Sequence, residues 1–220
     1  MCHEVDDPSN YPFWVGLFQE AALTLVDEQG LAALSMRTLA GALGTGPMTL
    51  YNYVKDRDEL DALVVEAVLS EVKPPRSRGE WQADVRAIVE ATWRTVRRHP
   101  NVIPLVLTRR TLHETTLQWA EGLLEALARS GRRDSELLIA FRTVSGFVMG
   151  LAQAQLSGPT ADHPDVARAE ALPASHYPRL IEIAKAAKGL GPDREFRAGL
   201  DIVMAGLAAR RSGGPEGLAR

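Results

Sequence analysis

Residues 43–56 read LGTGPMTLYNYVKD, and this stretch decides the fold of the N-terminal part of the chain. Leu43 closes an apolar segment that begins at Ser35, and the Gly-Thr-Gly that follows interrupts it. Glycine adopts the positive φ of a tight corner without steric cost, and Pro47 suits the first turn of a new helix. This order of helix, glycine-containing turn and second helix is typical of a helix-turn-helix unit.

The second helix is predicted to run from Pro47 to Val54, with one apolar and one polar face. Leu50 and Val54 share the apolar face because they are four residues apart. The polar side carries Met48, Thr49, Asn52 and Tyr53, with Lys55 just beyond. Asparagine can pair with adenine, threonine can contact a base or a thymine methyl, and tyrosine and lysine suit phosphates. The alternative interpretation is a short surface helix whose tyrosines pack into the core.

The flanking segments complete a small helical bundle. An alanine-rich amphipathic segment precedes the turn and ends at Gly30. Ser35 is a natural N-cap, which places Arg37 and Thr38 near a helix start, where backbone N–H groups favour phosphate. Asp56 can cap the following helix. Four helices in about 70 residues, each with one apolar face, can bury a shared core.

Residues 20–64 resemble the tetracycline-repressor (TetR) family of bacterial transcriptional regulators. The resemblance rests on an alanine-rich helix ending in glycine, followed by LxxLSMRxLAxxLG and GPMxLYxYVxDxDEL. It implies an all-α protein of about nine to ten helices, with a three- or four-helix DNA-binding domain before a helical ligand-binding and dimerisation domain. It also implies a homodimer that binds a palindromic operator on double-stranded DNA and is released when a small-molecule effector binds.

Carried over by position, the resemblance divides the predicted DNA contacts into two sets. The base contacts fall on Thr45, Pro47, Met48, Thr49 and Asn52. The phosphate contacts fall on Arg37, Thr38, Tyr51, Tyr53 and Lys55. Two features depart from the family's pattern, in which a basic residue often replaces Asn52 and a basic arm often precedes the first helix. This chain begins MCHEVDDPSN instead.

The N-terminal part of the chain is acidic, which is unfavourable for DNA binding. Residues 1–72 contain three basic and twelve acidic side chains, a net charge of −9. Neutralisation of phosphates supplies most non-specific affinity, so we expect modest operator affinity and a salt dependence of about three to five contacts per dimer. The alternative function is a helical small-molecule- or protein-binding module of the same family whose DNA binding is weakened or lost.

The segment KPPRSRGE at residues 73–80 interrupts the helical pattern. It predicts a DNA-binding domain at residues 11–72 and a ligand-binding and dimerisation domain at residues 80–211. Clear period-2 patterns are absent, so helices are expected throughout. Beyond the break the pattern predicts helices that begin at Trp81, Leu112, Asp134, Leu180 and Arg194, with a looser stretch at 158–173.

Two of these helices are predicted to meet a second copy of the chain. The helix at 134–157 is apolar nearly all round, so it needs cover on every side. The last helix presents an apolar stripe made of Phe196, Leu200, Val203, Met204 and Leu207. A two-fold homodimer supplies this cover and matches a palindromic operator. The alternative is that both are core helices of one domain.

The resemblance implies a ligand site among the helices that begin at Trp81, Leu112 and Asp134. Aromatic walls with a few polar groups are typical of such sites. The candidate lining residues are Trp93, His113, Thr116, Trp119, Phe141, Ser145, Met149 and Gln153. Ordinary core packing is the alternative for each aromatic side chain, and the identity of the ligand does not follow from the residues.

The sequence does not favour an enzyme. HExxH, GxSxG and GxxxxGK(S/T) are absent, and none of the five histidines is paired with another at i, i+4. No cofactor or metal is therefore predicted. The single cysteine excludes an internal disulfide framework, and no run of eighteen apolar residues predicts a membrane span. With no secretion signal at the N-terminus, we expect a cytoplasmic protein.

Overall fold

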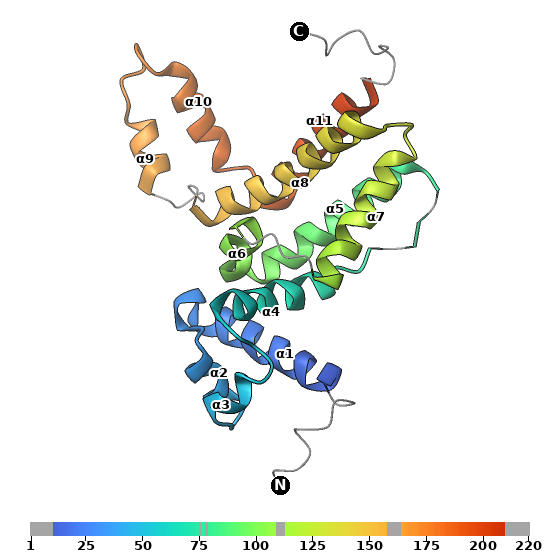
Figure 1. Ribbon diagram of the computed structural model, residues 1–220. Helices are drawn as coiled ribbons and strands as arrows, with labels where there is room; N and C mark the ends of the chain where they lie inside the picture. The colour runs from blue at the N-terminus through green and yellow to red at the C-terminus, as the bar shows by residue number, and fades with distance from the viewer. Residues whose placement is uncertain (1–10, 75, 78, 109–112, 158–163, 210–220) are drawn as a thin grey trace. The chain divides into compact units, whose positions relative to one another are not determined.

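The computed structural model describes residues 11–74, 76–77, 79–108, 113–157 and 164–209. These residues form eleven α-helices and two short 3-10 helices, with no strand among them (Figure 1). In chain order they are α1 (Tyr11–Gln29), η2 (Leu31–Ala33), α2 (Met36–Ala42), α3 (Pro47–Leu50), α4 (Arg57–Ser70), α5 (Trp81–Arg98), η3 (Pro100–Val102), α6 (Ile103–Thr108), α7 (Glu114–Ala128), α8 (Asp134–Ser157), α9 (Pro164–Glu170), α10 (Pro178–Ala187) and α11 (Pro192–Ala209).

The predicted all-α class is confirmed, although the number of helices was underestimated. One reason is α9, which begins at Pro164 inside the stretch that was expected to be loose. The chain forms two compact units, residues 1–126 and residues 127–220. The proline-containing segment expected to separate two domains lies inside the first unit, because α4 and α5 contact each other on either side of it.

The first unit is built around the packing of α1 on α4 and α2 (Figure 1). Apolar side chains from α1 to α4 form one buried cluster, which includes Ala22, Val26, Leu34, Leu39, Leu50, Val54, Leu60, Val64 and Val68. Gly44 takes φ +65° in the turn between α2 and α3, a conformation that favours glycine. Ser35 caps α2, since its side chain accepts a hydrogen bond from the backbone N–H of Thr38. The predicted helix-turn-helix is therefore present.

Helix α3 is shorter than predicted. It ends at Leu50 instead of Val54, and residues 51–53 form a turn. In this turn the N–H groups of Asn52 and Tyr53 donate to carbonyls three residues earlier, at 3.3 and 2.9 Å. Such tight bonds often close a helix. Val54 still reaches the core, where it is 1% exposed.

The second unit contains α8 packed on α11, and α9 packed on α10. The rings of Phe147 on α8 and Phe196 on α11 stack with centroids 5.9 Å apart. A Cβ atom at Gly199 would lie 2.6 Å from Phe147, so glycine permits this close approach. The stripe on α11 that was expected to face a second copy is instead turned into its own chain, where Phe196, Leu200, Met204 and Leu207 are buried.

Helix α8 leaves part of its apolar surface exposed. Leu138 and Ile139 on α8 are exposed, as is Ile202 on α11. Among the described helices, α8 has the length and composition that could cross a membrane, but a core helix of a soluble protein passes the same test. Only 28% of its most apolar segment is buried. Within the described residues of the second unit, part of this apolar surface is therefore left uncovered.

Candidate DNA-reading surface and ligand cavity

The DNA-reading surface predicted from the sequence lies on α2, the turn, α3 and the turn that follows. Met48 is 77% exposed and Tyr51 is 47% exposed. Arg37, Pro47 and Asn52 are also exposed. The structure thus brings these side chains to the surface, while Leu50 on the same short helix is fully buried.

Two of the predicted phosphate contacts also have roles in the fold. The Thr38 hydroxyl lies 2.7 Å from the carbonyl oxygen of Ala33 and donates to it, and the same side chain completes the capping box with Ser35. The ring of Tyr53 packs edge-on against Phe18, with centroids 5.1 Å apart. At Tyr53 the structure therefore agrees with the alternative interpretation, in which a tyrosine packs into the core. DNA contacts by Thr38 and Tyr53 remain predictions.

The basic side chains of the DNA-binding helices are partly engaged within the protein. The Arg57 Nε lies 2.7 Å from Oδ1 of the buried Asp61, and its guanidinium also donates to the carbonyl oxygen of Leu34. Lys55 Nζ lies 3.8 Å from Glu59, although the lysine side chain is 84% exposed. Arg57 therefore holds the start of α4 against the entry to α2, which reduces the positive charge available for phosphates.

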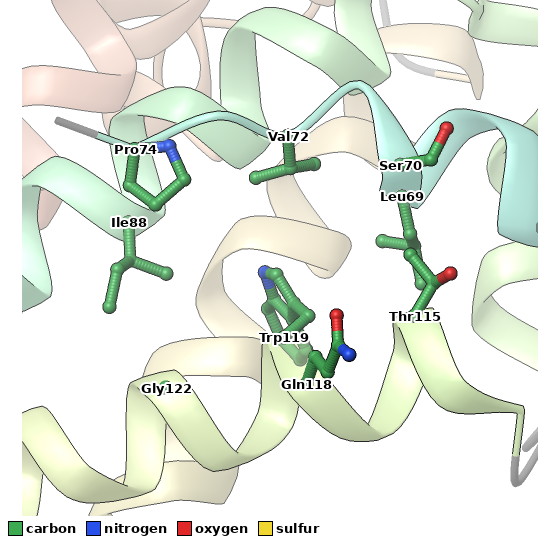
Figure 2. Close-up of a pocket in the computed structure, with 9 residues that line it drawn as sticks. All are labelled: Leu69, Ser70, Val72, Pro74, Ile88, Thr115, Gln118, Trp119 and Gly122. Carbon is green, nitrogen blue, oxygen red and sulfur yellow. The ribbon is translucent and has the colours of Figure 1, made fainter.

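A cavity of about 340 Å³ lies in the first unit, where α7 and α5 meet the end of α4. Its volume falls at the lower end of the range of small-molecule sites. Figure 2 shows the indole of Trp119 between Ile88 and Thr115, with Val72 and Pro74 across the cavity. The complete lining is Leu69, Ser70, Val72, Pro74, Ile88, Thr115, Gln118, Trp119 and Gly122.

Trp119 is held in place by a hydrogen bond from its indole nitrogen. Trp119 Nε1 donates to the Thr92 hydroxyl at 2.9 Å, and that hydroxyl donates to the carbonyl oxygen of Ile88 at 2.8 Å. The bond joins α7 to α5. Trp93 next to Thr92 is only 2% exposed and does not line the cavity, so the structure gives it a core position. The Arg97 guanidinium lies 5.7 Å from its ring centroid.

The other predicted ligand residues are dispersed. His113 is exposed, and its Nδ1 lies 3.6 Å from Glu66 on α4. Thr116 is half-buried on α7 but does not line this cavity. The remaining four are half-buried on α8 in the second unit, namely Phe141, Ser145, Met149 and Gln153. Their contact with a ligand, like that of Trp93, His113 and Thr116, stays a prediction.

Most residues of the cavity wall were missed from the sequence. Thr115 and Gly122 lie four residues before and three residues after Trp119, so helical spacing from that tryptophan points to them. The wall formed by Leu69, Ser70 and Val72 has no comparable signal, because these residues read as the end of a core helix and the start of a linker.

A helix-turn-helix with exposed side chains on its second helix, in one unit with a cavity lined by Trp119, is typical of helix-turn-helix transcriptional regulators. The comparisons with known proteins specify the family. The family model for the "Tetracyclin repressor-like, C-terminal domain" matches residues 73–211. The chain belongs to the TetR family of transcriptional regulators.

Three relatives illustrate this similarity. The repressor DrrR1 of Streptomyces coeruleorubidus is 31% identical over 203 residues, which cover 86% of this chain and 74% of DrrR1. The class A tetracycline repressor of Escherichia coli is 27% identical, with 87% of this chain and 88% of the repressor covered. The structure of ActR from Streptomyces coelicolor in complex with actinorhodin is 32% identical and has a TM-score of 0.78. That match covers 90% of this chain and 98% of ActR.

Proposed function

We propose that this protein is a ligand-responsive transcriptional repressor that binds a palindromic operator as a homodimer. An aromatic small molecule in the Trp119 cavity releases the operator. The observation that carries the proposal is the position of the cavity wall. Leu69 and Ser70 belong to the last turn of α4, and Val72 lies two residues beyond its end, so a ligand that fills the cavity pushes on the end of this helix.

Helix α4 connects the cavity with the DNA-reading helices. It packs along α1, which in turn contacts α2, and Arg57 at its first turn binds the carbonyl oxygen of Leu34 just before α2. A displacement of α4 therefore changes the support of α2 and α3. In a dimer this alters the distance between two reading helices, and operator half-sites have a fixed spacing.

The cavity favours a flat aromatic effector with a few polar groups. The indole of Trp119 offers a stacking surface, and Leu69, Val72 and Ile88 add apolar contacts. The Ser70 and Thr115 hydroxyls and the Gln118 amide supply donors and acceptors. The ActR complex with actinorhodin and the name of the tetracycline repressors support the same chemical class.

The homodimer is part of the proposal and is supported by the uncovered surface of the second unit. Leu138, Ile139 and Ile202 form an exposed apolar set on the two helices that pack together there. Burial of such side chains against a second copy removes apolar area from water. A dimeric DNA-binding regulator of this kind acts in the cytoplasm.

The test is selection of binding sites from random duplex DNA at low salt, followed by release with a ligand. We expect an enriched palindrome, and we expect tetracycline or actinorhodin to weaken binding of the selected site. The comparison variant is Gln118→Ala, which removes one polar group of the cavity wall, and we expect it to select the same palindrome but to respond less to these ligands. Failure of folded, dimeric protein to enrich any palindrome would contradict the proposal.

A second candidate function is a ligand-binding module with weakened DNA binding. It is favoured by the use of Arg57 inside the protein and by the net charge of −9 in residues 1–72. The same selection separates the two functions. The module would bind the aromatic probes without selecting a DNA sequence.

A further inference from the structure

The strongest candidate outside the cavity is a cluster around His99, between α5 and η3. His99 Nδ1 lies 2.7 Å from Asp27 Oδ2 near the end of α1. His99 Nε2 lies 3.2 Å from Glu71 Oε2 at the end of α4. The imidazole is 12% exposed. One ring therefore joins the ends of two DNA-binding-domain helices to the segment that precedes α6.

Two neighbouring side chains extend these contacts. Asn101 Nδ2 donates to the carbonyl oxygens of Val26 and Asp27, at 3.0 and 3.2 Å. These carbonyls belong to the last turn of α1, and the Val26 carbonyl also accepts from the N–H of Gly30 at 2.8 Å. Arg98 Nη2 lies 2.9 Å from Glu71 Oε2. We call Asp27, Glu71, Arg98, His99 and Asn101 the imidazole junction.

A neutral imidazole cannot donate a hydrogen bond to both carboxylates. A neutral ring has one N–H and one lone pair, whereas an imidazolium has two N–H donors. The neutral form can therefore donate to Asp27 or to Glu71, while its other nitrogen faces a carboxylate oxygen. Only the protonated ring donates to both. The second oxygen of Asp27, Oδ1, is buried and has no hydrogen-bond partner among the described residues.

The charged groups around the ring come from α1, the end of α4 and α5. Asp27 faces it from α1 and Glu71 from the end of α4, while Arg98 on α5 binds the same oxygen of Glu71. The residues of η3 and α6, PNV and IPLVLT, contain no titratable side chain. Two carboxylates thus face one imidazole and one guanidinium.

We propose that His99 is a positioning residue that fixes the ends of α1 and α4 to the segment before α6, and that its protonation strengthens this attachment and makes operator binding depend on pH. The effect on DNA rests on the proposed function, whereas the attachment does not. Glu71 lies between Ser70 and Val72 of the cavity wall, so protonation and ligand act on the same short segment.

The sign of the effect follows from the two protonation states. Histidine is the side chain whose charge ordinarily changes between about pH 5 and pH 8. The attachment is therefore complete at the acidic end of the range and is weakened as the pH rises and the ring loses its second N–H. A firmly attached α4 holds the reading helices for the operator, so affinity is expected to fall in the same direction.

The first experiment measures thermal unfolding of the full chain at about pH 5.5 and about pH 8, at one fixed protein concentration. His99→Gln keeps one amide donor but cannot carry a charge. We expect it to lower the Tm by about 2–4 °C at the lower pH and by at most about 1 °C at the higher pH. His176→Gln is the matched control, because His176 is exposed in the second unit. Equal losses at both pH values for His99→Gln would overturn the proposal.

A double-mutant cycle assigns the effect to the carboxylates. Glu71→Gln and Asp27→Asn are each combined with His99→Gln, since contacting residues give non-additive changes. We expect the Tm losses to be non-additive with both carboxylates at the acidic pH and with only one of them at the alkaline pH, where the neutral ring keeps a single donor. Additive losses at both values would show that His99 acts without these partners, which also overturns the proposal.

The second experiment measures operator affinity at the same two pH values, with the palindrome selected from random DNA. We expect the wild type and His176→Gln to show the same ratio of operator affinities between the two pH values. In His99→Gln this ratio should fall by at least about half. Equal pH dependence in all three proteins would overturn the regulatory part. If no palindrome is selected, the proposed function fails, and the thermal cycle still decides whether the junction exists.

Discussion

The DNA-reading surface and the ligand cavity use their side chains in different ways. On the reading surface, Met48 is 77% exposed while Leu50, two residues later, is fully buried. Exposure to a binding partner and burial in the core therefore fall on different residues of one short helix. In the cavity, Trp119 both lines the space and joins α7 to α5 through Thr92. We therefore expect substitution of exposed side chains on α3 to cost little stability, and substitution of Trp119 to cost more.

The largest expected effect tests this separation on α3 itself. Leu50→Ala leaves a cavity in the core of the helix-turn-helix, and we expect it to lower the free energy of unfolding by about 2–5 kcal/mol. Met48→Ala removes an exposed side chain from the same helix and should change it by less than about 0.5 kcal/mol. Chemical denaturation of both variants measures the difference. Similar losses would show that stability and DNA reading are not separable here.

A substitution in the cavity should affect both properties together. Trp119→Ala removes the aromatic wall and the hydrogen bond to Thr92, and we expect a loss of about 3 kcal/mol in stability. We also expect tetracycline or actinorhodin to lose its effect on operator binding, while the protein remains dimeric. Denaturation and operator titration measure the two losses.

Gln118→Ala is the informative comparison in the cavity, because Gln118 lines it and is exposed. It should weaken the ligand response and leave stability within about 0.5 kcal/mol. A Trp119→Ala variant that keeps the full response to these probes would place the site elsewhere. The candidates on α8 would then be tested next.

Asn52 provides the corresponding test on the reading surface. Its side chain is exposed in the turn after α3, where an amide can pair with an adenine. We expect Asn52→Ala to reduce discrimination at one base-pair position by about 1–3 kcal/mol, with unchanged stability. Repeating the DNA selection with the variant measures this. An unchanged consensus would exclude Asn52 from base reading.

The sequence was most informative where local rules and core packing agree. The glycine turn, the Ser35 cap and the apolar spacing together predicted the helix-turn-helix, and each is present in the structure. Local rules did not predict the early end of α3, because propensity does not reveal the tight bonds formed by Asn52 and Tyr53. Nor did they show that Phe196 and its stripe on α11 are buried in their own chain, since an apolar stripe does not specify its partner.

The candidate site was predicted only in part, for a related reason. Trp119 was found because a large aromatic residue with a polar atom is an obvious wall for a ligand. Glu71 and His99 were not singled out, because their meeting depends on the packing of α4 against the segment before α6. A contact between residues 28 positions apart has no signature in either local sequence.

The smallest expected effects concern phosphate contacts. Few basic side chains are present in this acidic domain, so those engaged in the fold can be compared directly with those that are exposed. Arg57 is held by Asp61 and by the carbonyl oxygen of Leu34, so it should contribute little to the salt dependence of DNA binding. Arg37 and Lys55 are exposed and lie beside the reading surface. We expect the slope of log affinity against log salt to correspond to about three to five contacts per dimer.

Arg37→Gln and Lys55→Gln should each weaken binding to all sequences alike and reduce this slope by about one per altered contact. Arg57→Gln should instead lower stability and leave the slope nearly unchanged, because its guanidinium supports the fold. Titration of one selected operator at several salt concentrations compares the three variants. A wild-type slope near ten, as for strongly electrostatic repressors, would mean that phosphates are bound by groups outside this surface. A shallow slope of log affinity against log salt would support recognition through neutral side chains such as Asn52. Salt also screens the repulsion between DNA and the acidic domain, which flattens the slope further.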